Sequence, residues 1–201
     1  IDPQNPDKNN WTDFIPEDQG VLQSINIVGG KIIAEYLKDA HSMAKTFNID
    51  GTPSADIDFP FLGSVSGFTG KIDDEFTFYS ITSFTTPSTI YKYNVKDNTS
   101  ELFQTTEIDF DASQYETKQV FYTSKDSTRV PMFIVRKKNI TLNGNNPVLL
   151  YGYGGFNISL TPGFSVSRLI WLEQGGIYAM MNLRGGGEYG EQKKKEANES
   201  N

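Results

Sequence analysis

The sequence has no cysteine and a single histidine, His41, among 201 residues. The absence of cysteine excludes a disulfide framework, a thiolate zinc site and a cysteine nucleophile. It also fits a reducing compartment. A serine-type charge relay needs an imidazole to accept the hydroxyl proton, and only His41 could supply one here. No spacing pairs His41 with an aspartate, and its strand-rich surroundings favour a solvated or hydrogen-bonded side chain.

Long apolar runs and an excess of positive charge are also missing. No run of 18 apolar residues occurs, so no segment is predicted to cross a bilayer. Residues 1–10 lack the apolar core of a signal peptide, so we expect none there. The net charge of −7 argues against nucleic acid or an anionic membrane as a partner. We expect no metal and no cofactor.

The first half of the sequence alternates short strand patterns with turn signals. Strands are predicted at 21–28, 31–37, 42–49, 63–68, 75–80, 89–95 and 101–105. Gly29-Gly30, Asp50-Gly51 and Asp97-Asn98 are turn signals between them. Segments 21–62 and 63–107 are each about 40 residues long, which is close to one four-stranded propeller blade. We therefore predict all-β propeller blades in this half.

Beyond Asp111 the pattern changes to that of a mixed α and β sheet. A hairpin is predicted over 118–124 and 130–137, and the apolar run 147–151 precedes a glycine-rich loop. A helix is predicted at 165–174 and a strand at 177–183, followed by a second glycine-rich loop from Arg184. Strand, loop, helix and strand in this order are typical of a parallel α/β sheet. The chain therefore combines an all-β part with the opening of an α/β part.

Three sequence strings invite sharper interpretations, which we weigh against simpler ones. Gly185 to Gly190 satisfies G-x-G-x-x-G, the dinucleotide fingerprint, but the sequence offers no acidic ribose ligand about 20 residues further on. Close backbone packing at a strand end explains the string better. Gly63-Ser-Val-Ser-Gly67 is not a nucleophile elbow, because Val65 stands where the serine should be. The charge run 191–201 is interpreted as a solvated segment.

Tyr151 and Tyr153 flank Gly152 at the end of an apolar strand. Ligands of α/β sheets bind at the carboxyl ends of strands. A tyrosine there can be a core residue whose hydroxyl reaches the rim, or it can donate a hydrogen bond to a developing oxyanion. Spacing and composition leave these two roles open.

Several strings resemble the prolyl oligopeptidase (prolyl endopeptidase) family. They are Leu150-Tyr-Gly-Tyr-Gly-Gly-Phe-Asn-Ile-Ser, Asn182-Leu-Arg-Gly-Gly-Gly-Glu-Tyr-Gly, Val130-Pro-Met-Phe-Ile-Val and, upstream, Phe121-Tyr-Thr-Ser-Lys-Asp. The resemblance implies a cytosolic serine peptidase that cuts short peptides after proline, with a seven-bladed propeller capping an α/β-hydrolase domain. On that basis residues 1–108 form the C-terminal part of the propeller, and residues 109–201 form the N-terminal part of the main hydrolase segment.

The resemblance assigns two site residues and leaves others missing. Tyr153 matches the phenol that donates to the oxyanion, and Phe156 matches the aromatic wall of the proline pocket. The family's Gly-Gly-Ser-Asn-Gly-Gly elbow does not occur in the sequence, nor do its catalytic aspartate and histidine, and Gln192-Lys-Lys-Lys stands where the family has Trp-His. We therefore expect an internal fragment that is inactive alone. Its expected partners are a proline-containing oligopeptide and the remainder of its own polypeptide.

Two alternatives stay open at this stage. The chain could be a non-catalytic, β-rich remnant that acts as an interaction module. It could also belong to a relative that macrocyclises peptides, because the fate of the acyl group after the leaving amine departs cannot be inferred from these residues.

Overall fold

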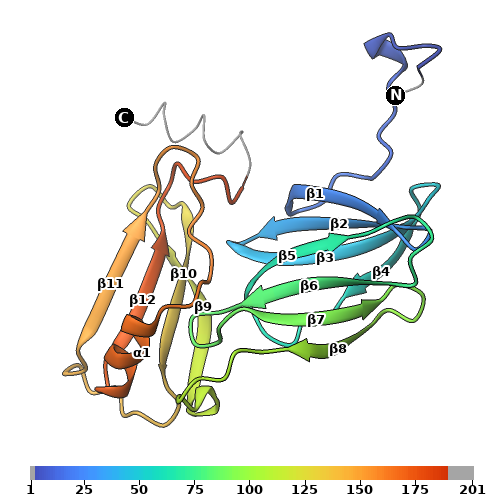
Figure 1. Cartoon of the computed structure of the whole chain (residues 1–201). Coiled ribbons are helices and arrows are strands. Elements are labelled where there is room, and N and C mark those ends of the chain that lie inside the picture. The colour runs from blue at the N-terminus through green and yellow to red at the C-terminus, as the bar shows by residue number, and fades with distance from the viewer. Residues whose placement is uncertain (1–2, 190–201) are drawn as a thin grey trace.

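A computed structural model describes residues 3–189. Within these residues the strands form three four-stranded sheets, and Figure 1 shows the first two side by side with the third next to them. Short 3-10 helices lie at Lys8–Asn10 and Ala112–Gln114. No helix of residues 3–189 is long and apolar enough to cross a membrane.

The first two sheets are antiparallel meanders in which each strand pairs with the next one along the chain. The first contains β1 (Val21–Val28), β2 (Lys31–Lys38), β3 (His41–Asn48) and β4 (Pro53–Ile57), and the second contains β5 (Ser64–Thr69), β6 (Phe76–Thr82), β7 (Thr89–Asn94) and β8 (Thr99–Gln104). Gly29 and Gly30 turn the chain between β1 and β2 as predicted. The sequence did not predict β4, which begins with a proline and occupies an edge of its sheet, where a missing N–H is tolerated.

One apolar cluster joins these two sheets. Phe68, Tyr79 and Tyr93 of the second sheet are almost completely buried, and Val28 and Ile57 of the first sheet belong to the same cluster. The Phe68 and Tyr79 rings stack with their centroids 4.9 Å apart. Side chains from facing sheets therefore fill a shared core, which fixes the two meanders against each other.

The third sheet is mixed. It contains β9 (Tyr115–Thr123), β10 (Arg129–Lys137), β11 (Val148–Tyr153) and β12 (Ile177–Asn182), in the spatial order β11-β12-β10-β9. β11 and β12 are parallel, and the connection between them contains α1 (Val166–Glu173), which buries Leu169 and Leu172. β9 and β10 form an antiparallel hairpin. The predicted hairpin, helix and parallel strand pair are thus all present.

A second apolar cluster joins the third sheet to the first two. Ala40 in the β2–β3 turn and Phe84 after β6 are fully buried, and they pack in one cluster with Phe133, Val135 and Tyr178 of the third sheet. Ala40 has a φ of +65°, a conformation that costs an L-residue free energy. The burial of this turn against the third sheet offsets that cost.

Candidate functional site

The candidate site lies where the parallel strands β11 and β12 end. Because the strands are parallel, their carboxyl ends lie side by side. β11 continues into the first glycine loop, which contains Gly154 and Gly155, and β12 continues into the second glycine loop, which runs from Arg184 to Gly187. The two loops are hydrogen-bonded to each other. The Leu183 N–H donates to the Tyr153 carbonyl at 3.0 Å, and the Asn157 N–H donates to the Gly185 carbonyl at 3.0 Å.

The loops approach so closely that side chains are excluded between them. Gly185 has a φ of +100°, and a Cβ atom at this position would collide with the carbonyl oxygen of Gly154. This confirms close packing as the role of this glycine, in preference to a dinucleotide loop. Gly190 and the charge run 191–201 lie outside the described residues.

Two buried polar side chains form hydrogen bonds with the segment that follows Phe156. Asn182 is buried, and its side-chain amide donates to the Leu160 carbonyl at 2.7 Å. Glu188 is also buried, and burial raises the pKa of its carboxyl group, while a side-chain hydrogen bond with Ser159 acts in the opposite direction. Two residues at the end of β12 and beyond it thereby hold the segment that follows Phe156.

Tyr153 and Phe156, the two residues that the resemblance singled out, lie on the first glycine loop and its strand. Tyr153 ends β11 and is half-buried, and its hydroxyl lies near Gly155, at 3.2 Å from the place that a Cβ atom would take on that glycine. Phe156 is 92% exposed, so a large apolar ring stands free of the described residues. A phenol donor and an exposed aromatic face therefore lie within four residues of each other.

Strained backbone presents the Phe156 ring. Phe156 and Asn157 have φ values of +52° and +61°, so two consecutive residues adopt the left-handed conformation. Asparagine tolerates this conformation but phenylalanine does so poorly. Hydrogen bonds from Asn157 to Gly185 and from Ile158 to Gly155 hold the turn. Such strain concentrates at functional sites, and only the asparagine gave a hint of it in the sequence.

Tyr151 lies two residues before Tyr153 and therefore on the same face of β11. It is about half exposed and pairs with Met180 of β12, within the sheet. Tyr153 pairs with Asn182, the last residue of β12, where the two glycine loops begin. Of the two tyrosines, Tyr153 is the one that the structure brings to the loops.

A cleft of about 530 Å³ separates the first glycine loop from the first two sheets. Its lining includes Gln23 and Ser42 from the first sheet and Asn157 and Ser159 from the third sheet's loop. Ser64 of β5 donates from its hydroxyl to the Pro162 carbonyl at 2.6 Å and thereby ties the two sides of the cleft together. The lining is mixed, since Val21, Leu37 and Val65 also contribute to it, and the cleft borders the segment that follows Phe156.

The other residues that the sequence singled out lie in the first two sheets. His41 begins β3, and burial lowers the pKa of its imidazole. Its Nδ1 has no hydrogen-bond partner among residues 3–189. Ser64 and Ser66 of the Gly63–Gly67 string lie in β5, which is antiparallel to β6, so the string is not a strand-to-helix elbow. Within the described part of the chain no cluster of three acidic, histidine or cysteine side chains is arranged to bind a metal.

Comparison with known proteins identifies the family. The family described as "Prolyl oligopeptidase, N-terminal beta-propeller domain" matches residues 1–106. A prolyl endopeptidase from Elizabethkingia meningoseptica is 47% identical to this chain over 187 residues, or 93% of the chain.

Two solved structures are similar over almost the whole chain. One comes from a structural and mechanistic analysis of two prolyl endopeptidases and matches 97% of the chain with a TM-score of 0.89 and 44% identity. The other is prolyl oligopeptidase B from Galerina marginata bound to a 35mer hydrolysis and macrocyclization substrate, which matches 92% with a TM-score of 0.83 and 32% identity.

The match covers much less of the relatives than of this chain. It spans 26% of the Elizabethkingia protein and 29% and 27% of the two solved chains, so this sequence corresponds to roughly a quarter of each. The family match over residues 1–106 confirms that the two meanders are propeller blades. The chain therefore belongs to the prolyl oligopeptidase family.

Proposed function

We propose that this chain is part of a serine endopeptidase that cleaves oligopeptides on the carboxyl side of proline. Residues 1–108 form the C-terminal part of its propeller, and residues 109–201 form the N-terminal part of its α/β-hydrolase segment. The parallel β11–α1–β12 unit supports the second assignment. The protein acts in the cytoplasm on proline-containing oligopeptides, and neither nucleic acid nor a membrane is a partner.

One observation carries the proposal. Tyr153 and Phe156 lie in one short segment at the carboxyl end of β11, beside the end of the parallel strand β12, and Asn157 and Ser159, which follow them, line the cleft toward the propeller blades. A phenol that can donate and a flat apolar ring are the groups that an acyl-transfer site specific for proline requires. A peptide bound along this segment would present its proline to Phe156 and its scissile carbonyl to Tyr153.

The chemistry divides between this chain and the rest of the polypeptide. A serine hydroxyl attacks the carbonyl carbon of the proline residue, and an imidazole accepts the hydroxyl proton and returns it to the leaving amine of the next residue. The sequence contains no Gly-Gly-Ser-Asn-Gly-Gly elbow, so both groups come from elsewhere in the complete protein. Tyr153 donates to the oxygen that gains charge in the tetrahedral state, together with a backbone N–H.

Phe156 supplies specificity. Proline has no N–H, and its ring offers mainly apolar surface, so a flat aromatic face suits it. The left-handed backbone at Phe156 and Asn157 turns the ring outward, where it is almost fully exposed. Substrate binding covers this face, which favours binding through burial of apolar surface.

The test uses the complete protein and a Gly-Pro peptide with a fluorogenic amide as leaving group. Tyr153→Phe keeps the ring and should lower kcat on the order of 10²-fold or somewhat less, because one backbone donor remains. KM should change little, since the contact forms only in the transition state. Tyr151→Phe is the matched control and should be milder. A severe loss in Tyr151→Phe with normal kcat in Tyr153→Phe would contradict the assignment.

Specificity has a separate test. A Gly-Ala reporter with the same leaving group should be cleaved far more slowly than the Gly-Pro reporter. Equal rates for the two reporters would contradict cleavage after proline. The 201-residue chain alone should release no product from either reporter, whereas turnover abolished by His41→Ala would show that the chain carries its own base.

A macrocyclising function is the second candidate. It is favoured by the likeness to the Galerina protein, whose structure holds a substrate for both hydrolysis and macrocyclization. In cyclisation the substrate's own amine attacks the acyl-enzyme in place of water, so the product is lighter than the hydrolysis product by one water. Mass spectrometry of products from a long proline-containing peptide separates the two. A solely linear product supports the peptidase.

The third possibility is a non-catalytic interaction module. The discriminating observation is the intact mass of the native protein. A mass near 22.5 kDa would support the remnant, and a mass several times larger would support the peptidase.

A further inference from the structure

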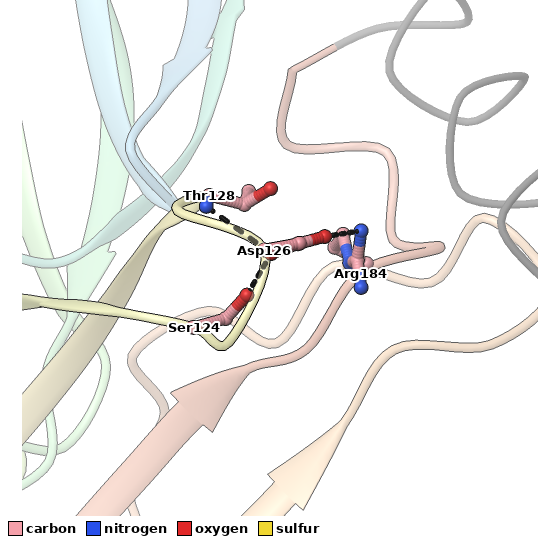
Figure 2. A network of polar contacts seen from close by, with 4 residues as sticks. All are labelled: Ser124, Asp126, Thr128 and Arg184. Carbon is pink, nitrogen blue, oxygen red and sulfur yellow. Dashed lines mark hydrogen bonds and ion pairs between the residues drawn. The ribbon is translucent and has the colours of Figure 1, made fainter.

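The turn of the β9–β10 hairpin lies beside the second glycine loop, although 58 residues separate the two in the sequence. Asp126 of this turn forms an ion pair with Arg184, the residue that opens the loop, and Figure 2 shows the two side chains meeting between the segments. The Ser124 hydroxyl and the Thr128 N–H also donate to the Asp126 carboxylate, the latter at 3.2 Å.

These contacts hold the Asp126 carboxylate in one orientation. The hydrogen bond from Ser124, together with that from Thr128 and the charge of Arg184, lowers the pKa of Asp126 to about 2. The turn itself is closed by hydrogen bonds from the Ser124 N–H to the Thr128 carbonyl and from the Ser127 N–H to the Ser124 carbonyl. Asp126 is therefore an ionised, fixed acceptor on a well-formed hairpin.

Arg184 transmits this restraint to the segment that carries Tyr153. Leu183, just before it, donates to the Tyr153 carbonyl, and Gly185, just after it, accepts from the Asn157 N–H. Gly185 also packs directly on the Gly154 carbonyl. Because the loops touch through backbone atoms, they have little freedom to move independently, and a shift of Arg184 moves residues 153–157 with it.

We propose that Asp126 and Arg184 are positioning residues that clamp the second glycine loop and thereby hold the Tyr153 hydroxyl where the oxyanion forms. This inference rests on the proposed role of Tyr153. Neither residue needs to touch substrate. The clamp acts through the backbone contacts between the two loops.

The solvent exposure of the Asp126–Arg184 ion pair indicates that it affects catalysis more than stability. The Arg184 and Asp126 side chains are 42% and 41% exposed, and ion pairs this open to solvent add little to stability. Catalysis is more sensitive, because a displacement of about 1 Å in a catalytic group can cost on the order of 10²-fold in rate. Loss of the clamp should therefore reduce kcat while the protein remains folded.

The experiment uses the complete protein and the Gly-Pro reporter. Asp126→Asn should lower kcat about tenfold, with KM within about twofold and the melting temperature almost unchanged. Arg184→Met should behave in the same way, and Arg184→Lys, which keeps a cation, should retain most of the activity. Arg184→Met gives the answer independently if Asp126→Asn does not fold.

A matched control comes from the other end of the same hairpin. Glu116 of β9 forms an ion pair with Arg136 of β10 at 2.7 Å, and these two residues face each other across the strands. Glu116→Gln removes one carboxylate charge from the hairpin, as Asp126→Asn does, but far from the glycine loops. Its kcat should equal that of the unmodified protein.

A double-mutant cycle separates the clamp from the proposed role of Tyr153. In a Tyr153→Phe background, Asp126→Asn should lower kcat by less than about twofold, because the group that it positions is already gone. An equal loss in both backgrounds, or no loss with Tyr153 intact, overturns the clamp. If Tyr153→Phe alone leaves kcat unchanged, the role of Tyr153 fails, and with it the reason for the clamp.

Discussion

Replacing Gly185 by alanine tests whether contact between the glycine loops controls the site. Gly185 has a φ of +100°, and a Cβ there would collide with the Gly154 carbonyl oxygen. Gly175, just after α1, provides a matched control because its φ is +83° and nothing lies within 4 Å of its added Cβ. The two substitutions share the conformational penalty, and only one adds a steric collision.

The magnitudes follow from this difference. A left-handed conformation costs an L-residue about 1–2 kcal/mol, which is the whole expected loss of unfolding free energy for Gly175→Ala. Overpacking typically adds about 1–3 kcal/mol, so Gly185→Ala should cost about 2–5 kcal/mol in total. Part of the collision will be relieved by separation of the loops, which moves the segment from Tyr153 to Asn157. We therefore expect kcat to fall by about tenfold or more.

Denaturant unfolding and turnover of the Gly-Pro reporter by the complete protein measure the two effects. Gly175→Ala should leave kcat unchanged, because the turn after α1 leads into the start of β12, whereas the second glycine loop follows the end of that strand. The reasoning is refuted if the two variants lose the same stability and Gly185→Ala keeps normal kcat, since that result would mean that the loops separate without consequence.

Three further predictions concern substrate binding, pH and the exposed sheet. Phe156→Ala should raise KM for the Gly-Pro reporter several-fold and change kcat less, because apolar contact with proline is lost; an unchanged KM would exclude contact with the ring. Burial raises the pKa of Tyr93 to about 12, and its hydroxyl donates to Asn98. The phenol of the unfolded chain ionises near pH 10, so the contribution of Tyr93 to the free energy of unfolding is constant below pH 10 and declines between about pH 10 and 12. Urea unfolding should show a smaller decline for Tyr93→Phe. The chain alone should bind a hydrophobic dye at the apolar face of the third sheet, where residues such as Val120, Ile134 and Met181 line a cavity of about 550 Å³, and the complete protein should bind much less.

The fold of the first half was largely predictable because its cause is local. Alternating polar and aromatic residues in the 75–80 stretch match β6, and the Gly29-Gly30 turn fixes the register of β1 and β2. β4 escaped prediction because Pro53-Ser-Ala-Asp-Ile has neither alternation nor many β-branched residues. Its strand is defined by pairing with β3, which is a tertiary interaction.

The second half shows the same division between local and tertiary causes. The predicted helix 165–174 exceeds the observed Val166–Glu173 by one residue at each end. Ser165 is the N-cap residue, but its hydroxyl makes no capping hydrogen bond and lies 2.9 Å from the Ser167 hydroxyl. The helix is stabilised mainly by burial of Leu169 and Leu172, and caps matter less when packing decides.

The candidate site was predictable only where a string of residues carries it. Tyr153 and Phe156 follow from the Tyr-Gly-Tyr-Gly-Gly-Phe string and its resemblance, and their assigned roles remain predictions. The consecutive left-handed residues Phe156 and Asn157 have no local signal strong enough to predict them. The Asp126–Arg184 pair is also invisible in the sequence, because no periodicity links a hairpin turn to a loop 58 residues later.

The second glycine loop and the residues just after it are bound by two segments that lie far apart in the sequence. Asp126 of the hairpin binds Arg184 at the start of the loop, and Asp39 of the β2–β3 turn accepts a hydrogen bond from the Tyr189 hydroxyl at 2.9 Å beyond it. The Asp39 carbonyl also accepts from the Gln119 side chain, and the adjacent Ala40 is buried against the third sheet. A propeller blade and a hairpin thus both bind the segment that begins at Arg184. We expect a change at either place to be transmitted to Tyr153 through the backbone contacts between the two glycine loops.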